Sequence, residues 1–355
     1  MLHQRGFMKT FPEPERPTVP YSSDIKTSAP AGLSTTWVLH KIWPYIAIAK
    51  PDYWFKNVFM ILGVLLGFFY HPETVDKRLM TRILWALAST CLIASSNYVL
   101  NEILDGPTDR NHPVKRHRPI PSAQVMLLPA YAEWLLLGVI GLAMAYRLNL
   151  LFFCSGLFLL FMGLIYNVPP VRSKELPYVD VLSESINNPI RLLLGWFVVT
   201  ERELPPASLV MAYWMIGSFF MAAKRFAEYR FIGDSVTARA YRSSFGYYDE
   251  QKLLTSMFFY TTCFGLFLGV FIIRYHLELI LFVPFIAGFI TYYLHIAFKD
   301  NSPAQNPERL YREKGLMLYL VICLALFILL MFTQIPVLYD LFNVPSSPLP
   351  PLWKF

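Results

Sequence analysis

Residues 83–110 read ILWALASTCLIASSNYVLNEILDGPTDR, a largely apolar run that ends in amides and carboxylates. An α-helix rises 1.5 Å per residue, so about 20 apolar residues cross the roughly 30 Å of hydrocarbon in a bilayer. The apolar part of this run meets that length, and its polar end reaches the membrane boundary. The run therefore predicts a transmembrane helix that carries charged side chains to the edge of the bilayer.

Similar apolar windows recur along the whole chain. Of its 355 residues 55% are hydrophobic and only 15% are charged, and the mean hydropathy is +0.42. That is too apolar for a soluble chain of this length, and the windows lack the two-residue alternation of a membrane β-barrel. We predict an all-α polytopic membrane protein with about nine transmembrane helices, at 44–70, 80–104, 122–146, 149–167, 179–200, 206–224, 253–274, 277–298 and 314–335.

The distribution of cations predicts the orientation. About 21 of the 31 Lys and Arg residues lie on one side of the predicted spans and about 7 on the other. Cytoplasmic loops carry the excess of Lys and Arg, so the N-terminus is expected in the cytoplasm and the C-terminus on the opposite side. The net charge of +7 is then a matter of topology, and no nucleic-acid partner is expected.

The same span limits predict three segments. Residues 1–43 are polar and Pro-rich without the apolar core of a signal peptide, and we expect them to form a disordered cytoplasmic tail. Residues 44–335 form the transmembrane domain, and residues 336–355 an extracytoplasmic tail. The four cysteines fall within spans and form no C-x-x-C pair, so neither a disulfide framework nor a zinc site is expected.

The densest polar group follows the second span. Asn97, Asn101 and Asp105 are spaced four residues apart and share one helix face. Pro107 is expected to end or kink the helix near Asp105, so that Asp109 points back from the loop. Converging carboxylate oxygens suit Mg²⁺. An ordinary loop of mixed charge is the alternative, but boundary carboxylates in register are costly and favour a functional site.

Cations accompany this group on the same side of the membrane. Arg116 and Arg118 follow it in the loop and suit phosphate binding. After the sixth span come Lys224 and Glu228, an i, i+4 pair beside Arg225. Cations that snorkel from a helix end are the alternative reading of that cluster.

Further polar groups are expected to face one cavity on the cytoplasmic side, together with the two groups described above. Arg191 lies deep in the fifth span beside Asn187 and Asn188, and it requires a polar cavity or a carboxylate such as Asp105 or Glu228. A structural ion pair between helices is the alternative. The loop YNVPPVRSKELPYVD, residues 166–180, adds Tyr166, Asn167, Arg172, Lys174 and Asp180, and the first span adds Lys56 and Asn57.

Three segments resemble a known family. NEILDGPTDRNHPVKRHRPI, residues 101–120, resembles the first Asp-rich motif of the UbiA-type intramembrane prenyltransferases, usually N-D-x-x-D-x-x-x-D followed by a K-x-R-P-like loop. KPDYWFKN (50–57) and KRFAEYR (224–230), with YRSSFGYY (241–248), resemble the branch of polyprenyl-phosphate (decaprenyl-phosphate) phosphoribosyltransferases. The resemblance implies a nine-helix bundle over about residues 44–335 with a site that opens to the cytoplasm and to lipid.

The resemblance also implies a reaction. A 5-phosphoribosyl group would pass from phosphoribosyl pyrophosphate to a polyprenyl phosphate, with Mg²⁺ as cofactor and diphosphate as the leaving group. Glu102 stands where the family usually has Asp, and the segment YNVPPVRSK is closer to ordinary prenyltransferases. Prenyl transfer from a prenyl diphosphate to an aromatic or other small acceptor is therefore the second hypothesis. A non-catalytic transporter or lipid-binding bundle is the third.

Site roles follow from these motifs. A ribose donor requires hydrogen-bond partners for its hydroxyls, whereas an isoprenoid donor requires a second acidic cluster for metal and an apolar tunnel. The chain has no obvious second D-x-x-x-D, which favours ribose. The predicted catalytic residues are Asp105, Asp109, Glu228 and Arg191; the predicted metal ligands are Asn101, Glu102, Asp105 and Asp109; the predicted substrate-binding residues are Lys56, Asn57, Asn97, Arg116, Arg118, Tyr166, Asn187, Asn188, Lys224, Arg225, Arg230, Tyr241 and Arg242.

Overall fold

A computed structural model describes residues 35–74, 76–110 and 115–345. Most of the predicted N-terminal tail and the last part of the predicted C-terminal tail lie outside these residues. The chain divides into two compact units, residues 1–41 and residues 42–355, and the helical bundle belongs to the second.

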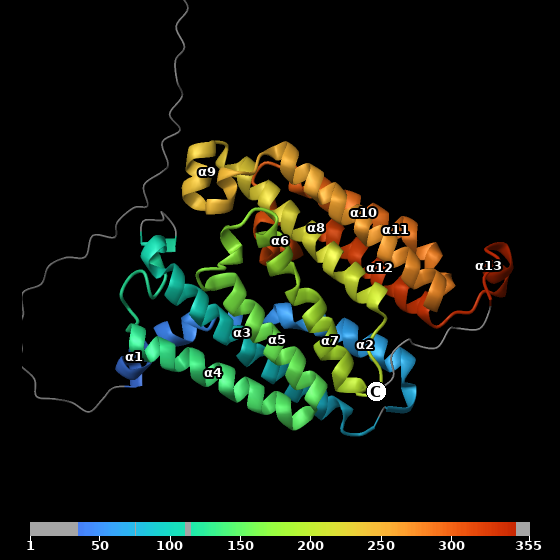
Figure 1. The fold of residues 1–355 in the computed structure, drawn as a ribbon, viewed down its shortest axis with the longest axis horizontal. Coiled ribbons are helices and arrows are strands. Elements are labelled where there is room, and N and C mark those ends of the chain that lie inside the picture. The colour runs from blue at the N-terminus through green and yellow to red at the C-terminus, as the bar shows by residue number, and fades with distance from the viewer. Residues whose placement is uncertain (1–34, 75, 111–114, 346–355) are drawn as a thin grey trace, which may run out of the picture. The chain divides into compact units, whose positions relative to one another are not determined.

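The described residues are predominantly helical, and the predicted all-α fold is confirmed (Figure 1). The α-helices are α1 (Thr35–Ile48), α2 (Met60–Tyr70), α3 (Leu79–Asp109), α4 (Leu127–Leu148), α5 (Leu150–Asn167), α6 (Val179–Ser185), α7 (Asn187–Val199), α8 (Ala207–Ile232), α9 (Ser235–Tyr241), α10 (Glu250–Tyr275), α11 (Val283–Ala297), α12 (Lys314–Met331) and α13 (Pro336–Leu341). The 3₁₀ helices are η1 (Pro51–Phe59), η2 (Pro72–Thr74), η3 (Lys115–His117), η4 (Ser173–Glu175), η5 (Ser243–Gly246), η6 (Leu277–Phe282), η7 (Pro303–Gln305) and η8 (Pro307–Arg312).

Eight helical segments of the described chain are long and apolar enough to cross a membrane. The chain is thus an integral, multi-pass membrane protein, although the predicted count of nine is not confirmed. The expected fifth span, 179–200, is broken into α6 and α7 at Ile186. Pro189 explains the break, because its ring crowds the carbonyl of Ser185 and its nitrogen has no hydrogen to donate.

Pro107 has the opposite outcome. Helix α3 runs through it to Asp109, so of the two expected outcomes, an end or a kink near Asp105, the end is wrong. The N–H of Arg110 donates to Gly106 O at 3.2 Å and continues the helical pattern past the proline. Transmembrane helices tolerate such prolines where neighbouring elements satisfy the freed backbone. Asp109 therefore stands one turn beyond Asp105 on the same helix rather than in a loop.

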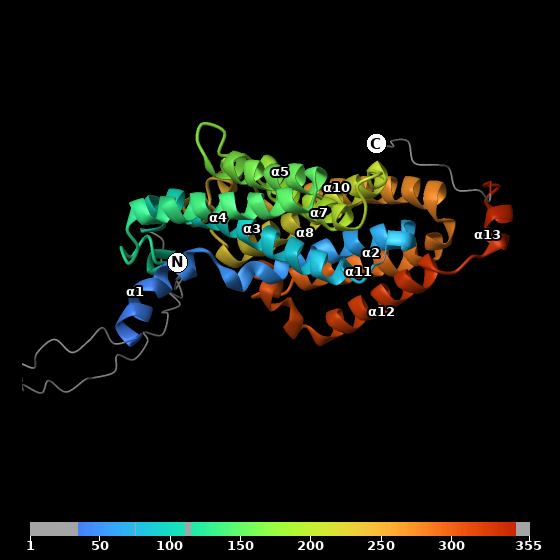
Figure 2. The ribbon, with the colours of Figure 1, turned by 90° about the horizontal axis from the view of Figure 1, so that it is seen from below.

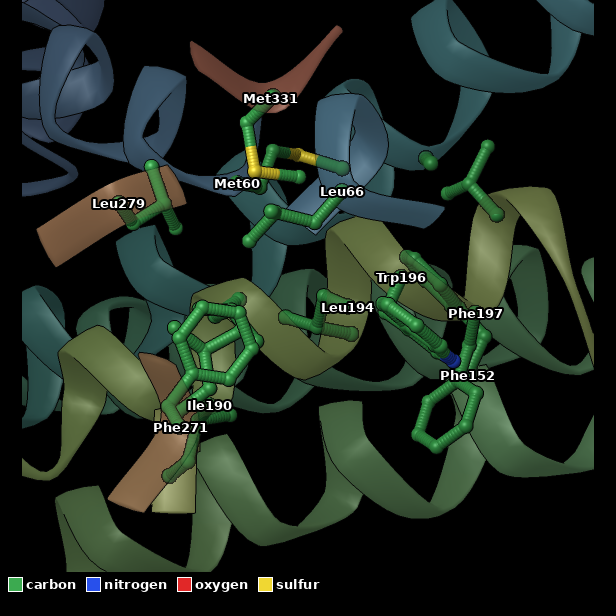
Figure 3. Close-up of a cluster of buried hydrophobic side chains, with 14 of the residues drawn as sticks. Met60, Leu66, Phe152, Ile190, Leu194, Trp196, Phe197, Phe271, Leu279 and Met331 are labelled. Carbon is green, nitrogen blue, oxygen red and sulfur yellow. The ribbon is translucent and has the colours of Figure 1, made fainter. Parts of the chain in front are cut away.

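The long helices form two groups that meet at α7 and α8. Helices α2, α3, α4, α5 and α7 pack together, and α8 packs with α10, α11 and the short α6 (Figures 1 and 2). The first group closes on a buried apolar cluster that includes Met60, Leu66, Leu194, Trp196 and Phe152 (Figure 3).

Two glycines allow α2 and α7 to approach closely. A Cβ atom added at Gly195 would collide with the carbonyl oxygen of Met60, and one added at Gly63 would collide with that of Leu192. Small residues at such contacts are common where membrane helices pack backbone to backbone. This close packing fixes α7, which carries Arg191, against α2.

Candidate active site at one end of the bundle

The acidic row on α3 keeps the predicted spacing. Asn101 Nδ2 donates to Asp105 Oδ2 at 3.2 Å, which confirms that these two side chains share a face. The same amide nitrogen donates to Asn167 Oδ1 at 2.6 Å. The end of α3 is therefore joined to the end of α5 by amide contacts.

Asp105 is held by two cations from the loop after α5. Lys174 Nζ lies 2.6 Å and Arg172 Nη2 3.1 Å from Asp105 Oδ1. Lys174 Nζ also donates to Asn167 Oδ1 at 2.9 Å. Burial lowers the pKa of Lys174, and the neighbouring carboxylate of Asp105 acts in the opposite direction. Two cationic side chains therefore contact the carboxylate that the sequence predicts to bind a metal.

Asp109 is buried and has its own cations. Arg118 Nη1 lies 2.8 Å from its Oδ2, and Lys115 Nζ lies 4.0 Å from its Oδ1. Arg116, the third cation of this loop, is exposed and contacts the neighbouring His117 instead. Of the two arginines predicted to bind phosphate, the structure brings only Arg118 to the acidic row.

Glu102 is not part of this row. Its carboxylate is 1% exposed and lies 3.8 Å from Lys50 Nζ, and it accepts the N–H of Ile120 at 3.4 Å. Because Glu102 directly follows Asn101, its side chain leaves the helix on a different face from the one that Asn101 and Asp105 share. These contacts give Glu102 a structural role between α3, η1 and the following loop.

A second charged cluster surrounds Arg225 on α8. Its guanidinium is fully buried and lies 3.3 Å from Asp180 Oδ2, 2.6 Å from Glu184 Oε2 and 3.2 Å from Glu228 Oε2. The predicted pair of Lys224 and Glu228 forms at 3.9 Å. The buried guanidinium therefore compensates carboxylates from both α6 and α8 inside the bundle.

Hydroxyl groups complete this second cluster. Tyr248 OH donates to Asp180 Oδ1 at 2.7 Å, and Tyr166 OH donates to Glu184 Oε2 at 2.9 Å. Burial raises the pKa of Tyr248, and the Asp180 carboxylate raises it further, so the phenol retains the proton that it donates. Arg242 Nη1 lies 3.9 Å from Asp180 Oδ2.

The two clusters are adjacent. Lys115 Nζ, which approaches Asp109, also lies 4.9 Å from the centre of the Tyr241 ring. Tyr241 stacks on Phe245, which belongs to the segment that supplies Tyr248. The loop after α3 and the loop after α8 thus close over the same end of the bundle.

Arg191 has a different partner from the expected one. Its Nε donates to Asn57 Oδ1 at 2.9 Å, and among the described residues no carboxylate lies within ion-pair distance. The expected pairing with Asp105 or Glu228 is therefore wrong. Through this contact Arg191 joins α7 to η1.

Three other predicted residues make contacts within the bundle. Asn97 Nδ2 donates to the carbonyl of Leu159 at 2.9 Å, with Gly163 leaving room for its side chain. Asn187 Nδ2 donates to the carbonyl of Glu184 at 3.0 Å, and its Oδ1 is buried without a hydrogen-bond partner. Asn188 packs against Gly217 on α8.

Two predicted residues lie elsewhere. Arg230 pairs with Glu250 at 3.0 Å and covers the ring of Phe298, away from the Arg225 cluster. Lys56 Nζ lies over the ring of Tyr53 at 4.1 Å.

Sequence reasoning overlooks Glu184 altogether. Its signal is the i, i+4 spacing from Asp180 within a span whose other face is apolar. The proline that breaks the span after it makes α6 a short helix whose carboxylates meet α8. That spacing could have identified the pair as a second acidic group.

The donor chemistry of the α3 row fits Mg²⁺ in part. Asp105, Asp109 and Asn101 offer hard oxygen atoms along one face, but the described residues contain no group of three or more His, Cys, Asp or Glu side chains that would hold a metal ion unaided. Mg²⁺ is usually bound through one or two carboxylates together with water and substrate phosphates. The row therefore fits an ion that arrives with a diphosphate.

The fold and these clusters define a polytopic membrane protein with charged clusters at one end of its bundle. The UbiA prenyltransferase family matches residues 57–321, about three quarters of the sequence. The chain belongs to this family of membrane transferases, as its motifs predict.

Individual relatives agree with this placement. The decaprenyl-phosphate phosphoribosyltransferase of Mycobacterium tuberculosis is 29% identical over 213 residues, which are 58% of this chain and 64% of that protein. The enzyme of the same name from Corynebacterium glutamicum is 29% identical over 188 residues, 52% of this chain and 54% of that protein. The matches therefore span less than two thirds of these relatives.

Solved structures share the fold. A UbiA homologue from Archaeoglobus fulgidus, bound to GPP and Mg²⁺, superposes with a TM-score of 0.59 at 17% identity, covering 80% of this chain and 99% of that one. At this identity the likeness concerns the fold alone.

Proposed function

We propose that this chain is a Mg²⁺-dependent transferase that moves a 5-phosphoribosyl group from phosphoribosyl pyrophosphate to a polyprenyl phosphate. The observation that carries the proposal is the fully buried Arg225 among Asp180, Glu184 and Glu228. An isoprenoid donor would need free carboxylates here for a second metal site. Carboxylates already balanced by a guanidinium suit hydrogen bonds from sugar hydroxyls instead.

The α3 row would hold the diphosphate end of the donor. Asn101, Asp105 and Asp109 would hold Mg²⁺, which supplies charge neutralisation for the leaving diphosphate. Lys174 and Arg172, now on Asp105, are placed to transfer their contacts to phosphate oxygens, and Arg118 is placed to do the same from Asp109.

Bond breaking develops positive charge on the anomeric carbon of ribose. The bond from that carbon to the diphosphate oxygen breaks, and an oxygen of the acceptor phosphate forms the new bond. Preorganised cations lower the barrier by stabilising the departing diphosphate. Glu228 and the unpartnered Oδ1 of Asn187 would accept hydrogen bonds from the ribose hydroxyls.

The acceptor would keep its hydrocarbon chain in the bilayer. Lys224, Arg242 and Tyr166 lie at the same bundle end and would draw its phosphate to the Arg225 cluster. Arg191 and Asn57 lie between α7 and η1, where they would position the lipid deeper in the bundle. Catalysis would take place at the cytoplasmic face, where the cation-rich loops lie.

Prenyl transfer is the second candidate, and the contact between Lys174 and Asp105 is compatible with it. The loop of residues 166–180, which resembles that of ordinary prenyltransferases, places Lys174 on Asp105 in a way that does not depend on the donor. This contact would serve a prenyl diphosphate as well as a ribosyl one.

Diphosphate release separates the hypotheses. The purified chain should release diphosphate from phosphoribosyl pyrophosphate only with Mg²⁺ and polyprenyl phosphate present, and EDTA should abolish the release. Turnover restricted to a prenyl diphosphate would overturn the ribose donor. Inactivity with both donors would leave only a transporter or lipid-binding bundle.

A further inference from the structure

A separate cavity of about 830 Å³ lies at the end of the bundle opposite the charged clusters. Residues from the ends of α2, α7, α10 and α12 and from α13 line it. These helix ends lie at the opposite end of the bundle from α9 (Figure 1). This volume falls in the range of small-molecule sites. None of the residues assigned above to the transfer reaction lines it.

Aromatic rings form much of its wall. The rings of Tyr70 and Trp196 are 5.8 Å apart, those of His71 and Trp196 are 6.2 Å apart, and those of Phe69 and Phe332 are 5.4 Å apart. Aromatic side chains of this kind gather at the membrane–water interface, where one end is apolar and the other wet.

Glu278 is a structural member of the cavity. It is fully buried and accepts Tyr339 OH at 3.1 Å and the N–H of Ile335 at 3.0 Å, with His276 at 3.6 Å. These contacts tie α13 to the start of η6. Its charge is satisfied and is not available to a ligand.

Glu203 and Arg274 differ from Glu278. The Glu203 side chain is 21% exposed, and its ion-pair contact among the described residues is His71 Nε2, at 3.7 Å and beyond hydrogen-bond distance. Arg274 has no ion pair among the described residues, and its Nε is buried without a hydrogen-bond partner. Tyr70 OH and His71 Nε2 are likewise buried and unpartnered.

These groups suit a ligand with two charges. Buried polar atoms without partners are costly, and three of them line one cavity. An anion would satisfy Arg274, Tyr70 and His71 but would be repelled by Glu203, whereas a simple cation would leave Arg274 uncompensated. A molecule that carries both charges satisfies all of them.

We propose that this cavity binds the head group of a zwitterionic phospholipid. The phosphate would contact Arg274 and Tyr70, and the ammonium would contact Glu203 and the neighbouring aromatic faces through cation–π attraction. The acyl chains would remain in the surrounding hydrocarbon. The site would therefore be distinct from the acceptor lipid of the transfer reaction.

Native mass spectrometry of the purified full chain tests this assignment. Short-chain phosphatidylethanolamine should bind one-to-one, at least about tenfold more tightly than short-chain phosphatidylglycerol and than inorganic phosphate. Glu203→Gln should remove the preference for the amine lipid, and Arg274→Gln should weaken both lipids about tenfold. Glu201→Gln and Arg147→Gln, which alter exposed residues at the same bundle end, should change neither.

Other results would overturn the proposal. Equal binding of both lipids would remove the ammonium contact, and inorganic phosphate binding as tightly as the lipid would make the cavity a simple phosphate site. Absence of binding to all three probes would mean a hydrated cavity. The melting temperature of each variant without lipid, compared with that of the parent chain, separates loss of binding from loss of folding.

Discussion

In the α3 row, a single oxygen of Asp105 contacts two cations. Both come from a loop nearly seventy residues away in the sequence. Its partner on the same face, Asn101, contributes an amide rather than a second charge. The proposed binding of metal and diphosphate would therefore depend most on this carboxylate.

Asp105→Asn should reduce Mg²⁺-dependent diphosphate release by about 10²-fold or more, in the range seen when one key electrostatic contact of an active site is lost. The matched control is Glu175→Gln, since Glu175 pairs with the same Arg172 at 2.6 Å but lies outside the row. Equal activity of the two variants would contradict the metal assignment. Initial rates measure the outcome, and melting temperatures should be similar.

Arg225→Met should lower stability strongly. It leaves Asp180, Glu184 and Glu228 clustered without their buried cation, and loss of one partner from a buried pair costs about 3–5 kcal/mol.

Arg230→Met, five residues along the same helix, serves as the control. Its pair with Glu250 is partly exposed, and such a pair contributes about 1 kcal/mol or less. Thermal unfolding in detergent compares the two variants. Similar melting temperatures would show that the Arg225 cluster does not stabilise the bundle.

At the level of elements, the break between α6 and α7 organises the site. The short α6 turns Asp180 and Glu184 toward α8, while α7 continues into the bundle with Arg191 against η1. Pro189 lies in the first turn of α7, between the carboxylates of α6 and the apolar rest of α7.

The contact of α2 with α7 depends on the absence of a side chain. Gly195→Ala should destabilise the protein by about 1–3 kcal/mol, because the new methyl group meets the carbonyl of Met60. Gly269→Ala on α10 is the matched control, since no atom lies within 4 Å of its added Cβ and alanine favours helix by about 1 kcal/mol. A melting temperature for Gly195→Ala at or above that of the control would refute this packing.

For the whole molecule, the asymmetric distribution of cations predicts which end faces the cytoplasm. Glu175 and Glu201 lie on exposed loops at the two ends of the bundle. In intact cells a membrane-impermeant maleimide should label a Glu201→Cys variant and spare a Glu175→Cys variant, and permeabilisation should make both reactive. The parent chain, which has four cysteines of its own, provides the background. Labelling of Glu175→Cys alone in intact cells would reverse the topology.

The sequence alone determined the class of this protein and the acidic row of α3. Length and hydropathy of each window are local properties, so they predicted a multi-pass helical bundle. The spacing of Asn101 and Asp105 is also local, because residues four apart on a helix share a face wherever the helix lies. The i, i+4 pair of Lys224 and Glu228 was predictable for the same reason.

Only the tertiary structure decided which charges meet. Lys174 reaches Asp105 across sixty-nine residues, Glu184 reaches Arg225 across forty-one, and Arg191 reaches Asn57 across one hundred and thirty-four. Periodicity along one helix carries no information about which neighbour faces it. The two prolines make the same point, because Pro189 breaks its helix and Pro107 does not, and local propensity treats both alike while the packing around each one differs.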